Sequence, residues 1–397
     1  MWPRMYEKEG DKMKTIYFDN GATTMMDSRV VKAMEPYFSE EYGNASSTHH
    51  KGQEARRAIE LARDVIAKSI KAKSDEIVFT SGGTESNNFA IKGIAFANKD
   101  RGNHIIATTV EHDCVLNACR WLETQGFKVT YLDVDSEGFV NPEDLEKAIT
   151  NKTILVSIIH GNNEIGTIND LKALGEICRK HKVYFHTDAC QSHTKTELNV
   201  KKQPVDLITL NAHKAHGPKG VGALYIRKGT KITPLAHGGG QENNLRSGTE
   251  NVPGIVGFTK AVQLALKGKH VKYMTKLRDK LIEGILEIPD VKLNGPRNNR
   301  LCNNVNVSFK YVEGEAVGSY LDAKGICTST GSACSSHTLE PSHVLMAIGL
   351  TYEEAHGSLR LGISRFTTEQ EVDFVLKELK KTVNKLRKIS PLAKNVP

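Results

Sequence analysis

The sequence predicts an α/β protein built on a large, mostly parallel β-sheet. Short apolar runs recur through the first two-thirds of the chain, amphipathic stretches separate most of them, and the texture changes after residue 265. Strands that read as almost wholly apolar are typical of a parallel sheet that helices cover on both faces. We therefore expect a doubly wound sheet followed by a smaller α+β unit.

The elements are expected in the following order. The strand-like runs are EIVFTS (76–81), HIIATT (104–109), KVTYL (128–132), TILVSII (153–159), VYFHTD (183–188), DLITL (206–210) and GALYIR (222–227). The amphipathic stretches with helical periodicity are EARRAIELARDVIAKSI (54–70), TESNNFAIKGIAFAN (84–98), CVLNACRWLETQ (114–125) and LKALGEICRKH (171–181). The last third predicts helices near 251–267 and 270–287, a strand NVNVSF (304–309), a Gly-rich segment and a final helix at 369–388.

Composition excludes several classes of protein. The 397 residues are 39% hydrophobic and 25% charged, which excludes a disordered, collagen-like or coiled-coil chain. No apolar run approaches the ~20 residues of a membrane span. The net charge of +8 is spread along the chain, so we expect no nucleic-acid partner. Seven unevenly spaced cysteines indicate reduced thiols and a cytoplasmic location. The first fourteen residues contain three acids and no apolar core, so they resemble no targeting peptide.

Two motifs follow predicted strands. SGGTES (81–86) opens a helix, where glycines and free N–H groups can approach an anion and Thr84 can add a hydroxyl. Thr84 as a simple helix cap is the alternative. HTDACQS (186–192) places Asp188 at a strand's carboxyl end, where open α/β sheets bind ligands. Asp188 could hold a protonated ring nitrogen or cap a helix. His186, Cys190 and His193 are a rival set of metal ligands, although a strand does not align them.

A lysine and a cysteine lie in loops that suggest chemistry. Lys214 follows a strand within NAHKAHGPKGVG, and a desolvated lysine can form an imine with an aldehyde cofactor. Together with Asp188 it is the pairing that pyridoxal phosphate needs. Cys334 lies among small residues in TSTGSACSS (328–336), which suggests a reactive thiol. Arg360 can bind a carboxylate through two nitrogens. Solvated side chains and a surface ion pair are the alternatives for these residues.

Taken together, the motifs resemble those of the cysteine desulfurases, in the NifS/IscS-like branch. The resemblance runs from YFDNGATT (17–24) to SRFTTEQEVD (364–373). The matching blocks are SGGTES, EHDCVL, HGNNEIGT, HTDACQS, AHKAHGPKGVG, HGGGQENNLRSGTENVPG, STGSACSS and LEPSHVLMAIGL. It implies the fold of the type I pyridoxal-phosphate enzymes, with a seven-stranded sheet. The implied domains are a large one at 25–267, a small one at 13–24 and 268–397 carrying the cysteine loop, and an extension at 1–12.

The resemblance also implies roles for individual residues. The implied catalytic residues are Lys214, which binds the cofactor, Cys334, the nucleophile, and His112, which stacks on the cofactor ring. The implied cofactor contacts are Gly83, Thr84, Asn163, Asp188, Gln191, Asn211, His213 and Thr249, the last reaching the phosphate of a neighbouring subunit. Asn163 and Arg360 would bind the substrate. The implied partners are L-cysteine, a second copy of the chain, and an iron–sulfur scaffold or another sulfur acceptor. No resident metal is implied, although Cys334 could be a transient cluster ligand.

The chain departs from the family pattern at a few positions. Asn211 stands where a hydroxyl residue is usual, which removes a hydroxyl from the expected phosphate site, and Ala45 stands where proline is usual. Three other functions remain open. They are an aminotransferase or selenocysteine lyase on the same fold, a hydrolase using the metal set named above, and a non-catalytic sulfur scaffold.

Overall fold

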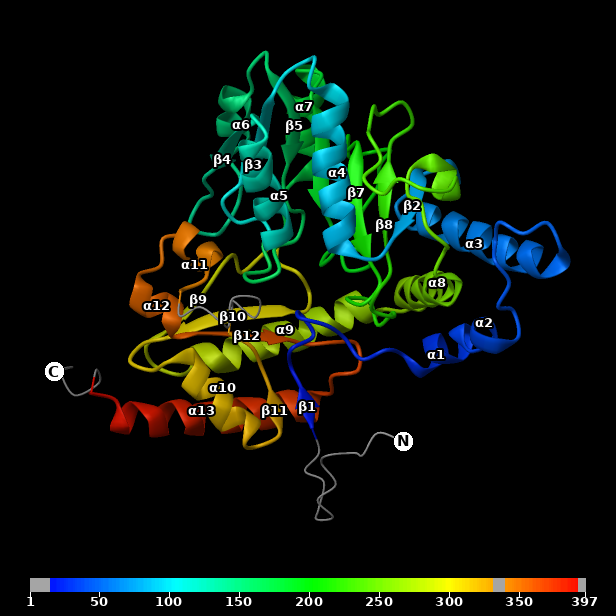
Figure 1. The fold of residues 1–397 in the computed structure, drawn as a ribbon. Coiled ribbons are helices and arrows are strands. Elements are labelled where there is room, and N and C mark those ends of the chain that lie inside the picture. Colours follow the sequence, from blue (N-terminus) through cyan, green and yellow to red (C-terminus); the bar gives the residue numbers. More distant parts are fainter. Residues whose placement is uncertain (1–14, 331–339, 392–397) are drawn as a thin grey trace.

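The computed structural model describes residues 15–330 and 340–391. Figure 1 shows a large sheet with its helices in the upper part and a C-terminal unit in the lower part. All seven predicted runs form strands of the large sheet, in the order β2-β8-β7-β6-β5-β3-β4. They are β2 (Ile77–Thr80), β3 (His104–Thr108), β4 (Lys128–Leu132), β5 (Thr153–Ser157), β6 (Tyr184–Asp188), β7 (Leu207–Asn211) and β8 (Gly222–Ile226). The expected α/β fold is confirmed.

The sheet is parallel from β4 to β7, and β8 runs antiparallel to both of its neighbours. Helices cover both faces. On one side lie α4 (Gly83–Asn98) and α5 (Asp113–Thr124), and on the other lie α3 (His50–Ser69), α7 (Leu171–Lys180) and α8 (Val252–Lys267). Because successive strand side chains point to opposite faces, Ile105 joins the α4/α5 core while Ile106 joins the other core. This double burial explains why the strands are apolar at nearly every position.

The C-terminal unit has its own core. A three-stranded antiparallel sheet has the order β12-β10-β9, and two short strands, β1 and β11, pair in parallel beside it. These strands are β1 (Ile16–Tyr17), β9 (Val291–Leu293), β10 (Asn304–Phe309), β11 (Ile326–Cys327) and β12 (Ser358–Gly362). The helices packed there are α9 (His270–Leu286), α10 (Gly314–Asp322) and α13 (Glu369–Ile389). The expected α+β texture is confirmed, and the exact domain bounds stay a prediction.

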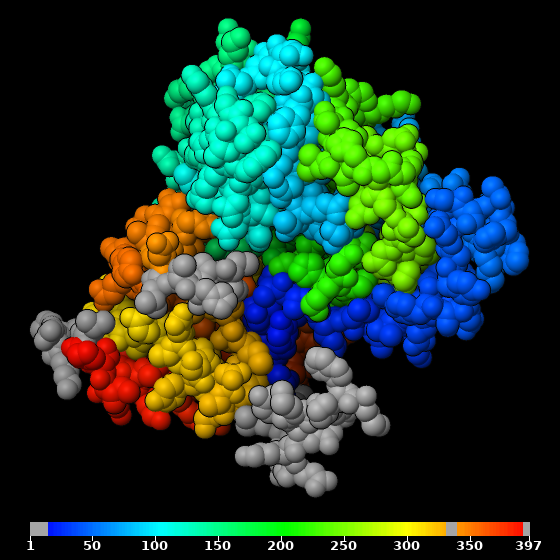
Figure 2. All heavy atoms as spheres, in the orientation of Figure 1, coloured from blue at the N-terminus to red at the C-terminus, as the bar shows by residue number. Residues whose placement is uncertain are grey.

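Five short helices complete the two units. They are α1 (Ser28–Met34), α2 (Pro36–Ser39), α6 (Pro142–Ala148), α11 (His343–Ala347) and α12 (Tyr352–His356). Of these, α6 packs within the large-sheet unit, against α7 and β4. Figure 2 shows the N-terminal segment, in blue, between the upper and lower units, and the α11–α12 segment, in orange, against the upper unit. Two 3₁₀ turns complete the chain, η1 (Ser74–Glu76) and η2 (Gln241–Asn244). No helix in the described ranges has the length and apolar character that a membrane span needs.

Candidate active site

A cavity of about 230 Å³ lies at the carboxyl ends of β6 and β7, beside the N-termini of α4 and α5. Open α/β sheets place their ligands at this edge. Nine of the predicted residues line it, although they come from five separate motifs between residues 83 and 214. They are Gly83, Thr84, His112, Asn163, Asp188, Gln191, Asn211, His213 and Lys214. Thr249 and Arg360 lie outside this lining, and Cys334 lies outside the described residues.

The N-terminus of α4 forms one end of the cavity. Its N-cap, Gly82, has a φ of +150° and no side chain to cap the helix, so the N–H groups of the first turn remain available. Gly83 packs closely against Cys190, because a Cβ at this position would lie 2.7 Å from the Cys190 Sγ. A larger residue than glycine would therefore displace the thiol. This end of the cavity suits an anion, as free N–H groups at a helix N-terminus do in general.

The Lys214 ammonium is held by the N-terminal segment of the chain. Its Nζ donates hydrogen bonds to the carbonyl oxygens of Gly21 and of Ala22, the latter at 2.8 Å. Gln191 Nε2 donates to the same Gly21 oxygen at 2.8 Å. The alternative that Lys214 is a solvated surface side chain is therefore wrong, since the side chain lines the cavity and has specific partners. Two backbone carbonyls orient its amine into the site.

Asp188 ends β6 and is 5% exposed. Its Oδ1 accepts a hydrogen bond from the Cys190 N–H at 2.8 Å, and its Oδ2 accepts one from Asn87 Nδ2 at 2.6 Å. The same Asn87 amide donates to Cys114 Sγ at 3.1 Å. Our sequence reasoning missed Asn87 and Cys114, which both line the cavity. Asn87 lies three residues after Thr84 on one helix face, and this spacing is the signal that would have found it.

His112 is the N-cap of α5. Its Nδ1 accepts the N–H of Cys114 at 3.2 Å, and the thiol of Cys114 lies 3.1 Å from the same nitrogen. Since Nδ1 accepts, the neutral ring carries its proton on Nε2.

His213 is a second histidine of the cavity. Burial, with the nearby Lys214 charge as the next cause, lowers the pKa of His213 to about 4. This ring is therefore neutral at physiological pH and shares a hydrogen bond of 3.1 Å with the Thr23 hydroxyl.

Arg360 is buried beside the cavity, on β12. Its Nη1 donates to the Asn163 carbonyl oxygen at 3.1 Å, and its Nη2 contacts Asp19 Oδ1 at 3.2 Å. The guanidinium passes directly over Gly21, where an added Cβ would lie 3.3 Å from Nε. The surface ion pair considered for Arg360 is wrong, because the residue is only 3% exposed. It links the C-terminal unit to the segment that holds Lys214.

Both described ends of the segment that contains Cys334 are fixed next to the cavity. Before it, Ser329 and Arg360 pair through their backbones at 2.7 and 3.3 Å. After it, the Ser342 hydroxyl donates to the buried Glu164 carboxylate, and His343 Nε2 lies 2.9 Å from the Glu111 carbonyl oxygen. Glu111 neighbours His112, and Glu164 neighbours Asn163. Arg360 and the direct chain neighbours of His112 and Asn163 thus anchor the chain on both sides of Cys334.

The rival metal set does not assemble. His186 is fully buried and shares hydrogen bonds with Ser157 at 2.8 Å and Thr209 at 3.1 Å, while His193 Nε2 lies 2.9 Å from the Ser69 hydroxyl. Burial lowers the pKa of both rings to about 4. Within residues 15–330 and 340–391, the histidines, cysteines and acids form no cluster that could hold a metal ion. The two histidines are core residues with hydroxyl partners.

Comparisons with known proteins agree with this geometry. The sequence matches the aminotransferase class-V family over residues 16–375. It is 55% identical to the cysteine desulfurase IscS of Dictyoglomus turgidum, over 95% of this chain and 97% of that protein. A solved NifS-like protein is 41% identical, with a TM-score of 0.89, over 94% of this chain and 100% of its own. A structure of SspA in complex with cysteine is 38% identical, with a TM-score of 0.81, over 89% and 100%. The chain belongs to the class-V aminotransferase family and, within it, to the cysteine desulfurases.

Proposed function

We propose that this protein removes sulfur from L-cysteine with pyridoxal phosphate as cofactor, and that L-alanine and a persulfide on Cys334 are the products. The observation that carries the proposal is the convergence of Lys214 and Asp188 on one cavity. The same chain is 55% identical to a cysteine desulfurase over 95% of its length. An aminotransferase would need the same pair, and the presence of Cys334 within the sequence block STGSACSS favours sulfur transfer instead.

The cavity fits the cofactor. Three buried amide oxygens, on Asn87, Asn163 and Asn211, line it and have no hydrogen-bond partner in the described chain. Buried acceptors without partners are unfavourable, so a bound group that donates hydrogen bonds would satisfy them. The N-terminus of α4 would hold the phosphate and Asp188 the ring nitrogen. When bound, pyridoxal phosphate supplies an electron sink for the charge left at the substrate Cα.

Lys214 would anchor the cofactor and then move the proton at the substrate Cα. The carbonyl oxygens of Gly21 and Ala22 hold its nitrogen in the cavity. To take a proton from the substrate, the lysine must first be deprotonated, because only the neutral amine has a lone pair. The carbonyl oxygens of the N-terminal segment therefore orient the charged ammonium through hydrogen bonds, and they hold the amine less tightly once it has lost a proton. Lys214→Ala is expected to abolish turnover.

Asp188 would keep a proton on the ring nitrogen of the cofactor. Its two oxygens are held by Cys190 N–H and by Asn87, so the carboxylate cannot rotate freely. Such fixed hydrogen bonds preserve the geometry that a charged pair requires. Asn87 is a positioning residue in this scheme, since it contacts Asp188 and Cys114 rather than the reacting atoms.

Arg360 would bind the substrate carboxylate. Its Nε is buried and has no acceptor in the described chain, although Nη1 and Nη2 already have partners. A carboxylate could accept from Nε and replace or share the weak contact with Asp19. The solved relative described as SspA in complex with cysteine supports an amino-acid substrate of this kind.

Cys334 would receive the sulfur. Its thiolate attacks the sulfur of the bound cysteine, the S–S bond forms, and the Cβ–S bond breaks with its electron pair going to carbon. One proton is then added to carbon, so L-cysteine and a thiol become L-alanine and a persulfide. The anchors at Ser329 and Ser342 support this assignment because they contact Arg360 and Glu164, and Glu164 follows Asn163 in the chain. A second nucleophile, such as a small thiol or a protein acceptor, takes the sulfur away.

A second copy of the chain and a sulfur acceptor complete the proposal. Thr249 is exposed and lies outside the cavity, as a residue that serves a neighbouring subunit would. Exposed apolar side chains on and near α1 and α2 support a contact surface for that copy, namely Met25, Val31, Phe38 and Tyr42. An iron–sulfur scaffold is the proposed acceptor, following the name of the IscS relative. The free state of the described cysteines supports a cytoplasmic location.

The assignment is tested with two variants in parallel. Cys334→Ser is expected to bind the cofactor with the wild-type absorbance spectrum and to release no sulfide from L-cysteine. Lys214→Ala is expected to lose both the covalently bound cofactor and turnover. Sulfide release by Cys334→Ser at the wild-type rate would refute the nucleophile, and turnover by Lys214→Ala would refute the lysine.

A further inference from the structure

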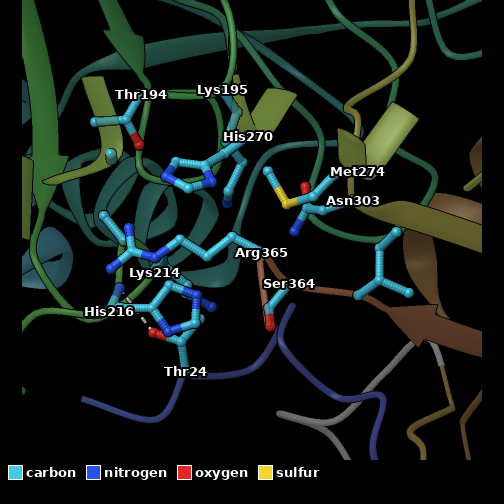
Figure 3. A pocket seen from close by; sticks show the side chains of 13 residues that line it. Thr24, Thr194, Lys195, Lys214, His216, His270, Met274, Asn303, Ser364 and Arg365 are labelled. Atoms are coloured by element: carbon cyan, nitrogen blue, oxygen red, sulfur yellow. Dashed lines mark hydrogen bonds between the residues drawn. The ribbon is translucent and has the colours of Figure 1, made fainter. Parts of the chain in front are cut away.

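A second cavity, of about 30 Å³, lies next to Lys214 and shares only this residue with the cofactor cavity. Figure 3 shows side chains from the large-sheet unit and from the C-terminal unit converging on it. Lys195 and His216 come from the first, and Asn303 and Arg365 come from the second. Its volume corresponds to about two water-sized spheres, at about 10–15 Å³ each. The cavity belongs to no step of the proposed reaction.

Two buried cations border this cavity with little compensating charge. Lys195 is 9% exposed, and its Nζ donates to the Gln191 carbonyl oxygen at 2.8 Å. No carboxylate of the described chain forms an ion pair with it, and burial lowers its pKa to about 8. The Arg365 side chain is 4% exposed and pairs with Asp27 at 2.8 Å. Asp27 also pairs with Arg29 at 2.7 Å, so one carboxylate serves two guanidinium groups.

One donor and one acceptor remain without hydrogen-bond partners at the same place. Arg365 Nε is buried and has no hydrogen-bond partner in the described ranges, and the same holds for the Asn303 side-chain oxygen. The positive charges of this region also lower the pKa values of two histidines that line the cavity, His216 and His270. Burial, followed by the charges of Arg365 and Lys195, lowers the pKa of His216 to about 4, and burial together with Arg365 lowers that of His270. Neither ring therefore adds charge at neutral pH.

We propose that this cavity is an anion site that binds one chloride-sized monovalent ion between Lys195 and Arg365. A buried charge is unfavourable unless a counter-charge and hydrogen bonds compensate it. A water molecule can accept from Nζ or Nε but brings no negative charge. The small volume suits a monatomic ion with one water better than a five-atom phosphate. The ion would join the segment after β6 to the segment after β12, and so hold the two units together beside Lys214.

The direct test uses crystals of the cofactor-loaded protein grown with sodium bromide, with data collected at the bromine absorption edge. The proposal expects an anomalous peak within hydrogen-bonding distance of Lys195 Nζ and Arg365 Nε. Density for water alone, or an anomalous signal only at the protein surface, would overturn it. The experiment is independent of the desulfurase proposal, because it reads the position of an ion and not turnover.

A solution test uses thermal unfolding of the cofactor-loaded protein at constant ionic strength, as chloride replaces gluconate. Gluconate is too large for the cavity. We expect the melting temperature to rise with chloride and to saturate, since a ligand that binds only the native state stabilises it. Lys195→Met should lose the rise, and Lys201→Met, an exposed lysine on the same segment, should keep it. Equal responses in all three proteins would refute the site. If Lys195→Met fails to fold, Arg365→Lys replaces it.

Discussion

Removing the Glu242 carboxylate is expected to destabilise the protein by several kcal/mol. Glu242 lies in η2 and accepts from Arg63 through both oxygens, at 2.6 and 2.8 Å. Its Oε2 also accepts the Phe79 N–H at 2.7 Å, on the outward side of the edge strand β2. The two side chains are 7% and 3% exposed, so neither can be rehydrated without opening the loop. The pair therefore fastens the η2 loop to the sheet.

The magnitude follows from this burial. Removing one partner of a buried ion pair typically costs about 3–5 kcal/mol, because the other charge is left unpaired. That is a large part of a typical domain stability of about 5–15 kcal/mol. An exposed pair should cost at most about 1 kcal/mol. Glu197, which contacts Lys202 at 3.2 Å with both side chains about two-thirds exposed, offers the matched control.

The assay is urea unfolding of Glu242→Ala, Glu197→Ala and the wild-type protein, followed by circular dichroism. The midpoint should fall clearly for Glu242→Ala and hardly change for Glu197→Ala. The double variant Arg63→Ala/Glu242→Ala should lose less than the sum of its single variants, because the unpaired charge is gone. Equal losses for Glu242→Ala and Glu197→Ala would refute the reasoning.

Three further predictions concern the site. Asp188→Asn should lower kcat/KM about 10- to 150-fold, because a hydrogen bond to a charged group contributes about 1.5–3 kcal/mol; unchanged steady-state kinetics would contradict its role. Arg360→Lys should raise KM for L-cysteine about tenfold, since lysine lacks the planar fork, and an unchanged KM would place the substrate carboxylate elsewhere. Burial raises the pKa of Glu111 to about 8, so the folded protein keeps a proton that the unfolded chain loses near pH 4.3. Its stability should fall by about 1.4 kcal/mol per pH unit between these values, and Glu111→Gln should remove this slope in urea titrations at pH 5 to 8.

The sequence predicted the strands of the large sheet well because burial on both faces leaves a strong local pattern. TILVS and LITLN are apolar or small at almost every position, and both are fully buried. It could not predict that β8 enters between β2 and β7 in the opposite direction. Strand order depends on packing between distant segments, and no local pattern in GALYI encodes it.

The site was predicted through motifs whose members are close in sequence, and it was missed where contacts are long-range. Asp188 and Lys214 were found from their strand ends. The Lys214 contacts with Gly21 and Ala22 join residues about 190 positions apart through backbone oxygens, which no side-chain pattern reveals. Asn87 was missed because an asparagine within a helix pattern carries no signal until its partner Asp188 is placed. The alternative that Lys214 is a solvated surface side chain was wrong because its partners, Gly21 and Ala22, are distant in sequence.

The most direct test of the account is to add L-cysteine and a thiol reductant to the purified, cofactor-loaded protein and to measure alanine and sulfide together. The account predicts that both products appear in equal amounts and that Cys334→Ser makes neither in repeated turnovers. Pyruvate or another keto acid in place of alanine, or alanine without sulfide, would contradict it.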